Sequence, residues 1–155
     1  MPVLYLVRHA KAGSRHDWFG DDSARPLTAA GERQAQALAE RLAWLATGTV
    51  VSSPYLRCRQ TLQPLAQRVG TNVLTDTRLA EEQGFVGAVQ MLGELPHGSV
   101  LCSHGDVIPE TVQALQRRGC HIAGVPDWRK ASTWVIHRDD HDAFIEAEAW
   151  APPEV

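Results

Sequence analysis

An apolar run close to the start of the chain ends directly in a charged pair. Residues Val3–Val7 are aliphatic or aromatic, and Arg8 and His9 follow without a spacer. Such a run predicts a buried strand, and open α/β sheets bind ligands at the carboxyl ends of their strands. Arginine offers phosphate a planar fork of donors, and a neutral imidazole attacks phosphorus without adding negative charge. The pair indicates phosphate chemistry, provided that the rest of the chain supplies the other residues of a phosphoryl-transfer site.

Strand-like and helix-like segments alternate along the rest of the sequence. Short apolar runs predict strands at residues 49–51, 73–74, 98–103, 132–136 and 143–145. Helical periodicity predicts helices at residues 28–48, 53–69, 85–92 and 107–118. Thr28 and Ser53 are the expected caps of the first two helices. This alternation predicts an α/β fold, a three-layer α/β/α sandwich with a mostly parallel central sheet and an antiparallel edge strand.

Length and composition favour one domain. The 155 residues are 44% hydrophobic, so we expect a single domain at residues 1–150 and a flexible C-terminal tail at 151–155. A net charge of −3 without a basic stripe argues against nucleic acid as a partner. The three cysteines form no C-x-x-C pair, and the apolar runs are too short for a membrane span. These features predict a soluble cytoplasmic protein that binds neither nucleic acid nor membrane.

Two further positions bring basic side chains to the same edge of the predicted sheet. Arg57 lies just inside the helix after the second strand, and His104 ends the strand at residues 98–103. Because the carboxyl ends of parallel strands share one edge, these side chains are expected to converge on Arg8 and His9. For either histidine alone, a structural role at a strand end is the alternative. Together, two arginines and two histidines predict a site that surrounds a phosphoryl group with donors.

The loop at residues 11–26 is too long for a bare connector and is expected to serve function. Arg15 in this loop and Lys130 further along the chain are candidate substrate contacts, with exposed cations that bind nothing as the alternative. Trp18 and Phe19 either wall a ring of the substrate or pin the loop to the core.

Five segments, in this order, resemble the motifs of the histidine phosphatase superfamily, which is also called phosphoglycerate-mutase-like. They are Leu6–Ala10, Arg25–Gly31, Ser52–Thr61, Leu79–Glu81 and Ser103–Gly105. The resemblance implies that His9 is the nucleophile that becomes phosphorylated during turnover. It also implies that Arg8, Arg57 and His104 bind the phosphate, with His104 counted among the catalytic residues.

The resemblance further implies that Glu81 donates a proton to the leaving group, and the adjacent Glu82 is the alternative for this role. Such a group must hold a proton when an oxygen leaving group departs, and its carboxylate then helps water to attack phosphohistidine. Because arginines supply the positive charge, no metal and no other cofactor is expected.

Within the superfamily, two branches share further features with this chain. The short length and the opening Arg8–Lys11 resemble the short bacterial branch that includes phosphohistidine phosphatases. Residues 20–22, 107–109 and 130–135 are similar to the histidine-phosphatase domain that some actinobacterial proteins carry behind a Nudix domain. The second likeness implies a nucleotide as one substrate class, and a Nudix-type partner enzyme is then expected to be a separate chain.

The sequence thus predicts a metal-independent phosphatase that works through a phosphohistidine intermediate on His9. Its expected substrate is a phosphohistidine protein, or a small phosphate ester or nucleotide. Two alternatives stay open at this point. One is a regulatory module that binds phosphate, on a small molecule or a phosphoprotein, without turnover, and the other is a phosphoglycerate-type mutase.

Overall fold

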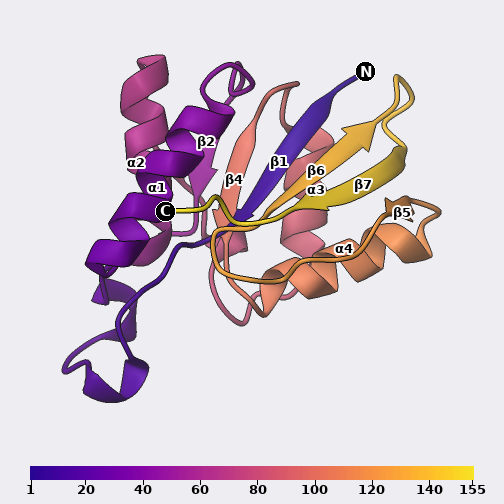
Figure 1. Ribbon diagram of the computed structural model, residues 1–155. Coiled ribbons are helices and arrows are strands. Elements are labelled where there is room, and N and C mark those ends of the chain that lie inside the picture. Colours follow the sequence, from indigo (N-terminus) through magenta and orange to yellow (C-terminus); the bar gives the residue numbers. More distant parts are fainter.

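The computed structural model describes residues 1–155 as seven strands in one sheet, with helices packed on it (Figure 1). The strands are β1 (Val3–Arg8), β2 (Val50–Ser52), β3 (Leu74–Thr75), β4 (Val100–Ser103), β5 (His121–Ala123), β6 (Thr133–Arg138) and β7 (Phe144–Trp150). The helices are α1 (Ala29–Leu42), α2 (Leu56–Val69), α3 (Val86–Glu94) and α4 (Val107–Arg117). Short 3-10 helices are η1 (Arg15–Asp17), η2 (Asp22–Ala24) and η3 (Thr77–Leu79).

The strand order in the sheet is β3-β2-β4-β1-β6-β7-β5, with β1 at the centre. Strand β1 runs parallel to β4, with Arg8 opposite Ser103, and β4 runs parallel to β2, with Cys102 opposite Ser52. These three strands therefore end at one edge of the sheet. The predicted α/β fold with a mostly parallel sheet is confirmed. The antiparallel strand is β6, which lies inside the sheet between β1 and β7, whereas the edge strand β5 pairs parallel to β7.

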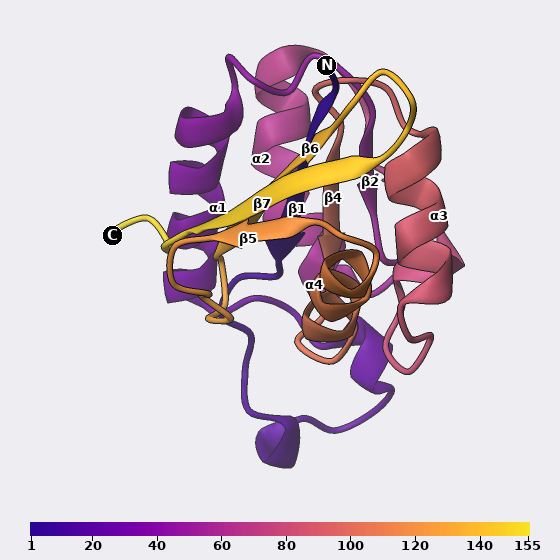
Figure 2. The same cartoon turned by 90° about the vertical axis from the view of Figure 1, so that its right-hand side faces the viewer.

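Strand β1 is buried on both faces, which explains its continuous apolar run. Leu4 and Leu6 point into a core layer with α3 and α4, whereas Tyr5 and Val7 point into a second layer with α1 and α2. Alternate side chains of a strand point to opposite faces, so a strand between two helix layers must be apolar throughout. Figure 2 shows α1 and α2 on one side of the sheet and α3 on the other. The three layers of the predicted sandwich follow from this pattern.

The two predicted helix caps have different outcomes. Thr28 caps α1 as expected, because its Oγ1 accepts a hydrogen bond from the Gly31 amide at 3.1 Å. Ser53 does not cap α2, which begins at Leu56 after Tyr55. The hydroxyl of Ser53 instead accepts a hydrogen bond from the Tyr55 amide at 3.2 Å and faces a histidine of the site. The prediction of a cap at Ser53 was wrong because the Tyr55 backbone is extended, with a ψ of 136°, so the helix begins only at Leu56.

Two features near the C-terminus complete the fold. The short strand β5 was not predicted from the sequence, and it adds to the sheet only by pairing with β7. Residues 151–155 form no helix or strand, although the Ala151 carbonyl accepts a hydrogen bond from Arg41 Nη1 at 2.6 Å. None of the four helices combines the length and the hydropathy that crossing a membrane requires.

Candidate active site

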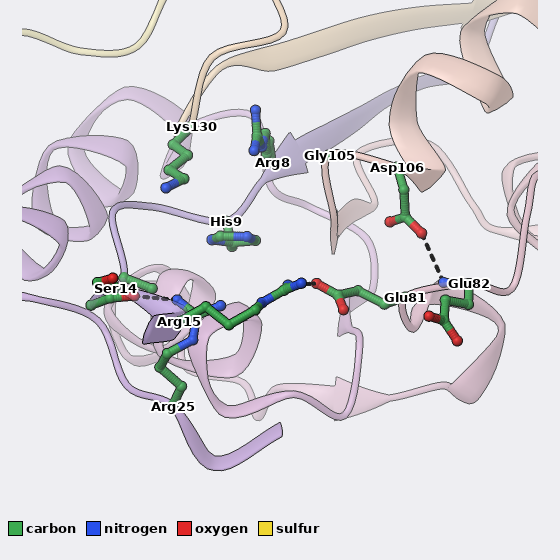
Figure 3. Close-up of a pocket in the computed structure, with 12 residues that line it drawn as sticks. Arg8, His9, Ser14, Arg15, Arg25, Glu81, Glu82, Gly105, Asp106 and Lys130 are labelled. Carbon is green, nitrogen blue, oxygen red and sulfur yellow. Dashed lines mark hydrogen bonds and ion pairs between the residues drawn. The ribbon is translucent and has the colours of Figure 1, made fainter. Parts of the chain in front are cut away.

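A pocket of about 490 Å³ lies where β1 and β4 end (Figure 3). Its wall is almost entirely polar and brings together residues from four separate parts of the chain. The lining residues are Arg8, His9, Ala12, Gly13, Ser14, Arg15, Arg25, Glu81, Glu82, Gly105, Asp106 and Lys130. Of the four residues predicted to converge at the carboxyl edge of the sheet, Arg8 and His9 line this pocket, whereas Arg57 and His104 are not among its lining residues.

His9 is held as a neutral imidazole with one free nitrogen. Its side chain is buried, and its Nδ1 lies 2.8 Å from the carbonyl oxygen of Ala10, so Nδ1 carries the proton that it donates. Its backbone amide donates to the Ser103 carbonyl at 3.1 Å, which ties it to β4. Burial, and then the nearby His104 and Arg57, lower the pKa of His9 to about 3. The Nε2 lone pair is therefore available for attack at neutral pH.

Arg57 is fully buried, and its guanidinium points at two carboxylates. Its Nη2 lies 2.6 Å from Glu81 Oε1 and 3.0 Å from Asp22 Oδ2, and its Nη1 donates to the Asp22 carbonyl at 2.9 Å. Thr61 joins α2 to the segment that follows β1, because its Oγ1 accepts from the Ala10 amide at 2.9 Å and donates to the Arg57 carbonyl. Arg57 is thus a fixed donor of charge-assisted hydrogen bonds next to His9.

Arg8 lies over Gly105, at the start of the loop that follows β4. Its Nη1 donates to the carbonyl oxygen of Trp128 at 2.6 Å, which fixes the plane of the guanidinium. A Cβ on Gly105 would lie 2.7 Å from both Cζ and Nη2 of Arg8, closer than carbon atoms approach. The glycine after His104 is therefore what allows Arg8 to turn its guanidinium toward the pocket.

His104 connects the buried end of β4 to the acidic side of the pocket. Its Nε2 lies 2.8 Å from Ser53 Oγ, and its Nδ1 lies 3.5 Å from Glu81 Oε1. Its ring packs edge-on against Tyr55 at 4.7 Å and against His9 at 5.5 Å between centroids. These contacts orient the imidazole so that its Nδ1 faces the Glu81 carboxylate.

Glu81 and Glu82 both line the pocket, but their surroundings differ. The Glu81 carboxylate contacts Arg57, His104 and Arg15, the last at 3.2 Å. Glu82 has a left-handed backbone with φ of 68°, and its amide donates to Asp106 Oδ2 at 2.8 Å. Only Glu81 therefore touches the predicted phosphate-binding residues.

Asp22 is a component of the site that the sequence reasoning missed. It accepts from Arg57 and from Arg25 Nε at 2.9 Å, and it lies 3.6 Å from Arg15 Nε. Burial alone would raise the pKa of Asp22, but the hydrogen bond from Arg25 and the charge of Arg57 lower it. The sequence offered only the loop at residues 20–22 as a signal, because the three partners of Asp22 are brought together by the fold.

The loop at residues 11–26 and Lys130 supply the remaining candidates. Arg15 and Lys130 both line the pocket, as the hypothesis of substrate contact requires. Trp18 and Phe19 do not line it, and the Phe19 side chain is 93% exposed, so it does not pin the loop to the core. The loop is held instead by Arg25, which bonds Asp22 and the carbonyl of Gly13.

This chain matches one family model and is similar to curated proteins of known name. The model of the family described as histidine phosphatase superfamily (branch 1) matches residues 4–85. The 8-oxo-(d)GTP phosphatase of Mycolicibacterium smegmatis is 33% identical over 98% of this chain and 49% of its own length. The probable phosphoglycerate mutase GpmB of Klebsiella pneumoniae is 36% identical over 83% of this chain and 54% of its own. The chain thus spans about half the length of these two curated relatives.

Solved structures show the same architecture. A putative phosphohistidine phosphatase SixA from Nakamurella multipartitia superimposes with a TM-score of 0.72 and 27% identity, over 99% of this chain and 97% of the other. A protein histidine phosphatase SixA complexed with tungstate superimposes with a TM-score of 0.75 over 97% of both chains, at 20% identity, and so shows the fold alone. The chain belongs to the histidine phosphatase superfamily, as its motifs indicated.

Proposed function

We propose that this protein is a metal-independent phosphatase that forms a phosphohistidine intermediate on His9. One observation carries the proposal. The Nδ1 of His9 donates a hydrogen bond to the Ala10 carbonyl at 2.8 Å. This leaves Nε2 as a nucleophile beside the buried guanidinium of Arg57. A site that only bound phosphate would need the donors but not a neutral, oriented nucleophile among them.

The first half of the proposed reaction transfers the phosphoryl group to the enzyme. His9 Nε2 forms a bond to phosphorus while the bond from phosphorus to the leaving oxygen breaks. Arg8, Arg57 and His104 stabilise the negative charge on the equatorial oxygens. Glu81 gives its proton to the departing oxygen, so the leaving group departs as an alcohol or its equivalent.

The second half releases inorganic phosphate. A water molecule attacks phosphorus and gives a proton to the carboxylate of Glu81 while the bond from phosphorus to Nε2 breaks. His9 is neutral again, and Glu81 again holds the proton with which the cycle began. The hydrogen bond from Nδ1 to Ala10 keeps the ring in the same orientation through both steps.

The relatives support two substrate classes for this chemistry. The 8-oxo-(d)GTP phosphatase matches almost the whole chain, which favours a small phosphate compound such as a nucleotide. The structure named a putative phosphohistidine phosphatase, at 27% identity, supports a phosphohistidine protein as the second candidate. Parallel measurements of kcat/KM on a nucleoside diphosphate, a phosphohistidine protein and phosphoglycerate separate these classes and the mutase alternative.

The proposed mechanism is tested by release of phosphate from 4-nitrophenyl phosphate. We expect His9→Ala to abolish this activity, and we expect EDTA to leave the native activity unchanged. His141→Ala is the matched control, because His141 is exposed on the turn between β6 and β7. Substantial activity in His9→Ala, or loss of native activity in EDTA, would contradict the proposal.

A further inference from the structure

The backbone of Lys130 is fixed directly to the nucleophile strand. The amide of the next residue, Ala131, donates to the carbonyl oxygens of Arg8 at 3.1 Å and His9 at 3.2 Å. Ala131 is fully buried and has a φ of 68°, a left-handed backbone that non-glycine residues seldom adopt. The connection between β5 and β6 is therefore anchored so that Lys130 cannot move far from the pocket without breaking these bonds.

The pocket has a cationic side and an acidic side. Figure 3 shows Lys130 and Arg25 on one side of His9, and Glu81 with the other carboxylates on the opposite side. The leaving group faces the acidic side at its oxygen, because Glu81 is the proposed proton donor. Both walls line the same cavity, so a substrate with more than one charged group can contact both.

Lys130 differs from the other cations of the pocket in having no partner. Arg25 bonds Asp22, and Arg15 bridges Glu81 and Asp22. The Lys130 ammonium has neither a hydrogen bond nor an ion pair to any residue. Burial, and then the positive charges of Arg8 and Arg25, lower its pKa, which is the mark of a cation placed without a counter-charge.

The unpaired ammonium of Lys130 is suited to bind an anionic group of a substrate. The cavity of about 490 Å³ falls within the range of small-ligand sites, about 300 to 1,000 Å³, so it has room beyond the transferred phosphoryl group. A lysine acts as a point charge with three donors and holds an oxyanion without demanding one orientation. Lys130 is one residue from the Ala131 anchor and lines the same pocket as His9, so its charge belongs to the cavity in which the phosphoryl group is transferred.

We propose that Lys130 binds a second phosphate, the one bonded through oxygen to the transferred phosphoryl group, so that the site prefers diphosphates to isolated monoesters. This inference rests on the proposed phosphatase function. In a diphosphate the leaving group is itself a phosphate. When the bond from the terminal phosphorus to the bridging oxygen breaks, the electron pair stays on that phosphate, and Lys130 stabilises its growing charge.

Two lysines in the chain make a matched pair of variants. Lys130→Met removes the ammonium in the pocket, and Lys11→Met makes the same change at an exposed side chain outside its lining. For Lys130→Met we expect kcat/KM on guanosine diphosphate to fall by about 10-fold to 100-fold, as for loss of one charged hydrogen bond. On 4-nitrophenyl phosphate the fall should stay below about 3-fold, since no second phosphate is present. Lys11→Met should change neither value, and Lys130→Arg should restore most of the diphosphate activity.

A binding measurement tests the same residue without turnover. Methylenediphosphonate and methylphosphonate are titrated into the native protein and into Lys130→Met by calorimetry. We expect the native protein to bind the diphosphonate at least about 10-fold more tightly, and Lys130→Met to lose that difference. Equal affinities in the native protein, or an unchanged preference in Lys130→Met, would overturn the role of Lys130. If the native protein hydrolyses neither phosphate compound, the phosphatase function fails, and the titration still decides whether Lys130 binds the second phosphate.

Discussion

Gly105 lies directly beneath the guanidinium of Arg8, and a Cβ at this position would approach Arg8 Cζ to 2.7 Å. We expect Gly105→Ala to push the guanidinium off its hydrogen bond to the Trp128 carbonyl and away from the phosphate position. Since Arg8 is proposed to bind the phosphoryl group before and during transfer, KM should rise and kcat should fall. We expect kcat/KM on 4-nitrophenyl phosphate to drop by about 10-fold or more, as for a lost charge-assisted hydrogen bond.

Gly93→Ala provides the control for that substitution. Gly93 lies in α3, and a Cβ there would meet no atom within 4 Å. We expect Gly93→Ala to keep full activity and to stabilise the protein by about 0.5 to 1 kcal/mol, because alanine favours the helix. A Gly105→Ala protein that is as active as Gly93→Ala would show that Arg8 does not depend on the space above Gly105.

The hydroxyl of Ser53 is expected to orient His104 for catalysis. Its Oγ lies 2.8 Å from His104 Nε2, and both residues are buried. We expect Ser53→Ala to lower kcat by about 10-fold, as for one buried hydrogen bond. Ser52→Ala removes a neighbouring buried hydroxyl, which donates to the Ser53 carbonyl without touching His104, and should lower kcat far less. Equal losses in the two variants would mean that packing, and not the bond to His104, is responsible.

Glu81 and Glu82 can be distinguished by the leaving group of the substrate. Phenyl phosphate needs a proton on its departing oxygen, whereas 4-nitrophenyl phosphate departs readily without one. We expect Glu81→Gln to lower kcat on phenyl phosphate by about 100-fold or more, and on 4-nitrophenyl phosphate much less. Glu82→Gln should affect both substrates alike. A leaving-group dependence in Glu82→Gln instead would assign the proton donor to Glu82.

The neutral state of His9 should make stability depend on pH. The pKa of His9 is about 3 in the folded protein and about 6.5 in the unfolded chain, so the unfolded chain binds more protons between these values. Stability from this group is therefore complete above pH 6.5 and is lost as the pH falls toward 3. Between pH 7 and pH 5 the native protein should lose about 2 kcal/mol more than His9→Gln in urea unfolding. Identical pH slopes would mean that His9 is not held neutral by burial.

The sequence predicted correctly those elements whose burial or hydrogen bonds depend on residues nearby in the chain. The run Val3–Val7 is buried on both faces, so its composition alone indicated a central strand. Thr28 caps its helix through its own neighbours, and the sequence indicated that as well. Strand β5 was missed because it has three residues and gains its hydrogen bonds only from β7, which lies far along the chain. Ser53 was wrongly predicted to cap α2 because the extended backbone of Tyr55 is not visible in the sequence, and neither is the contact of Ser53 with His104, 51 residues away.

The residues of the site likewise fall into those that the sequence predicted and those that only the structure shows. Arg8, His9, Arg57 and His104 were predictable as a group because each lies at or shortly after the end of a strand whose carboxyl end reaches the same edge. Asp22 was not, because its role comes from accepting the hydrogen bonds of Arg57 and Arg25 across the loop. The partner of His9 Nδ1 also required coordinates, since the carbonyl of Ala10 is identified only by the turn of the backbone after β1.

The phosphorylated form of His9 gives the most direct test of the proposed mechanism. Native protein is mixed with a substrate that carries ³²P in the transferred group, quenched in base within milliseconds, digested, and mapped by mass spectrometry. The hydrogen bond from Nδ1 to Ala10 leaves only Nε2 free, so we expect acid-labile phosphate on His9 at Nε2, and none in His9→Ala. Rapid turnover with no phosphate on His9, or with phosphate on Nδ1, would contradict the assignment of His9 Nε2 as the nucleophile.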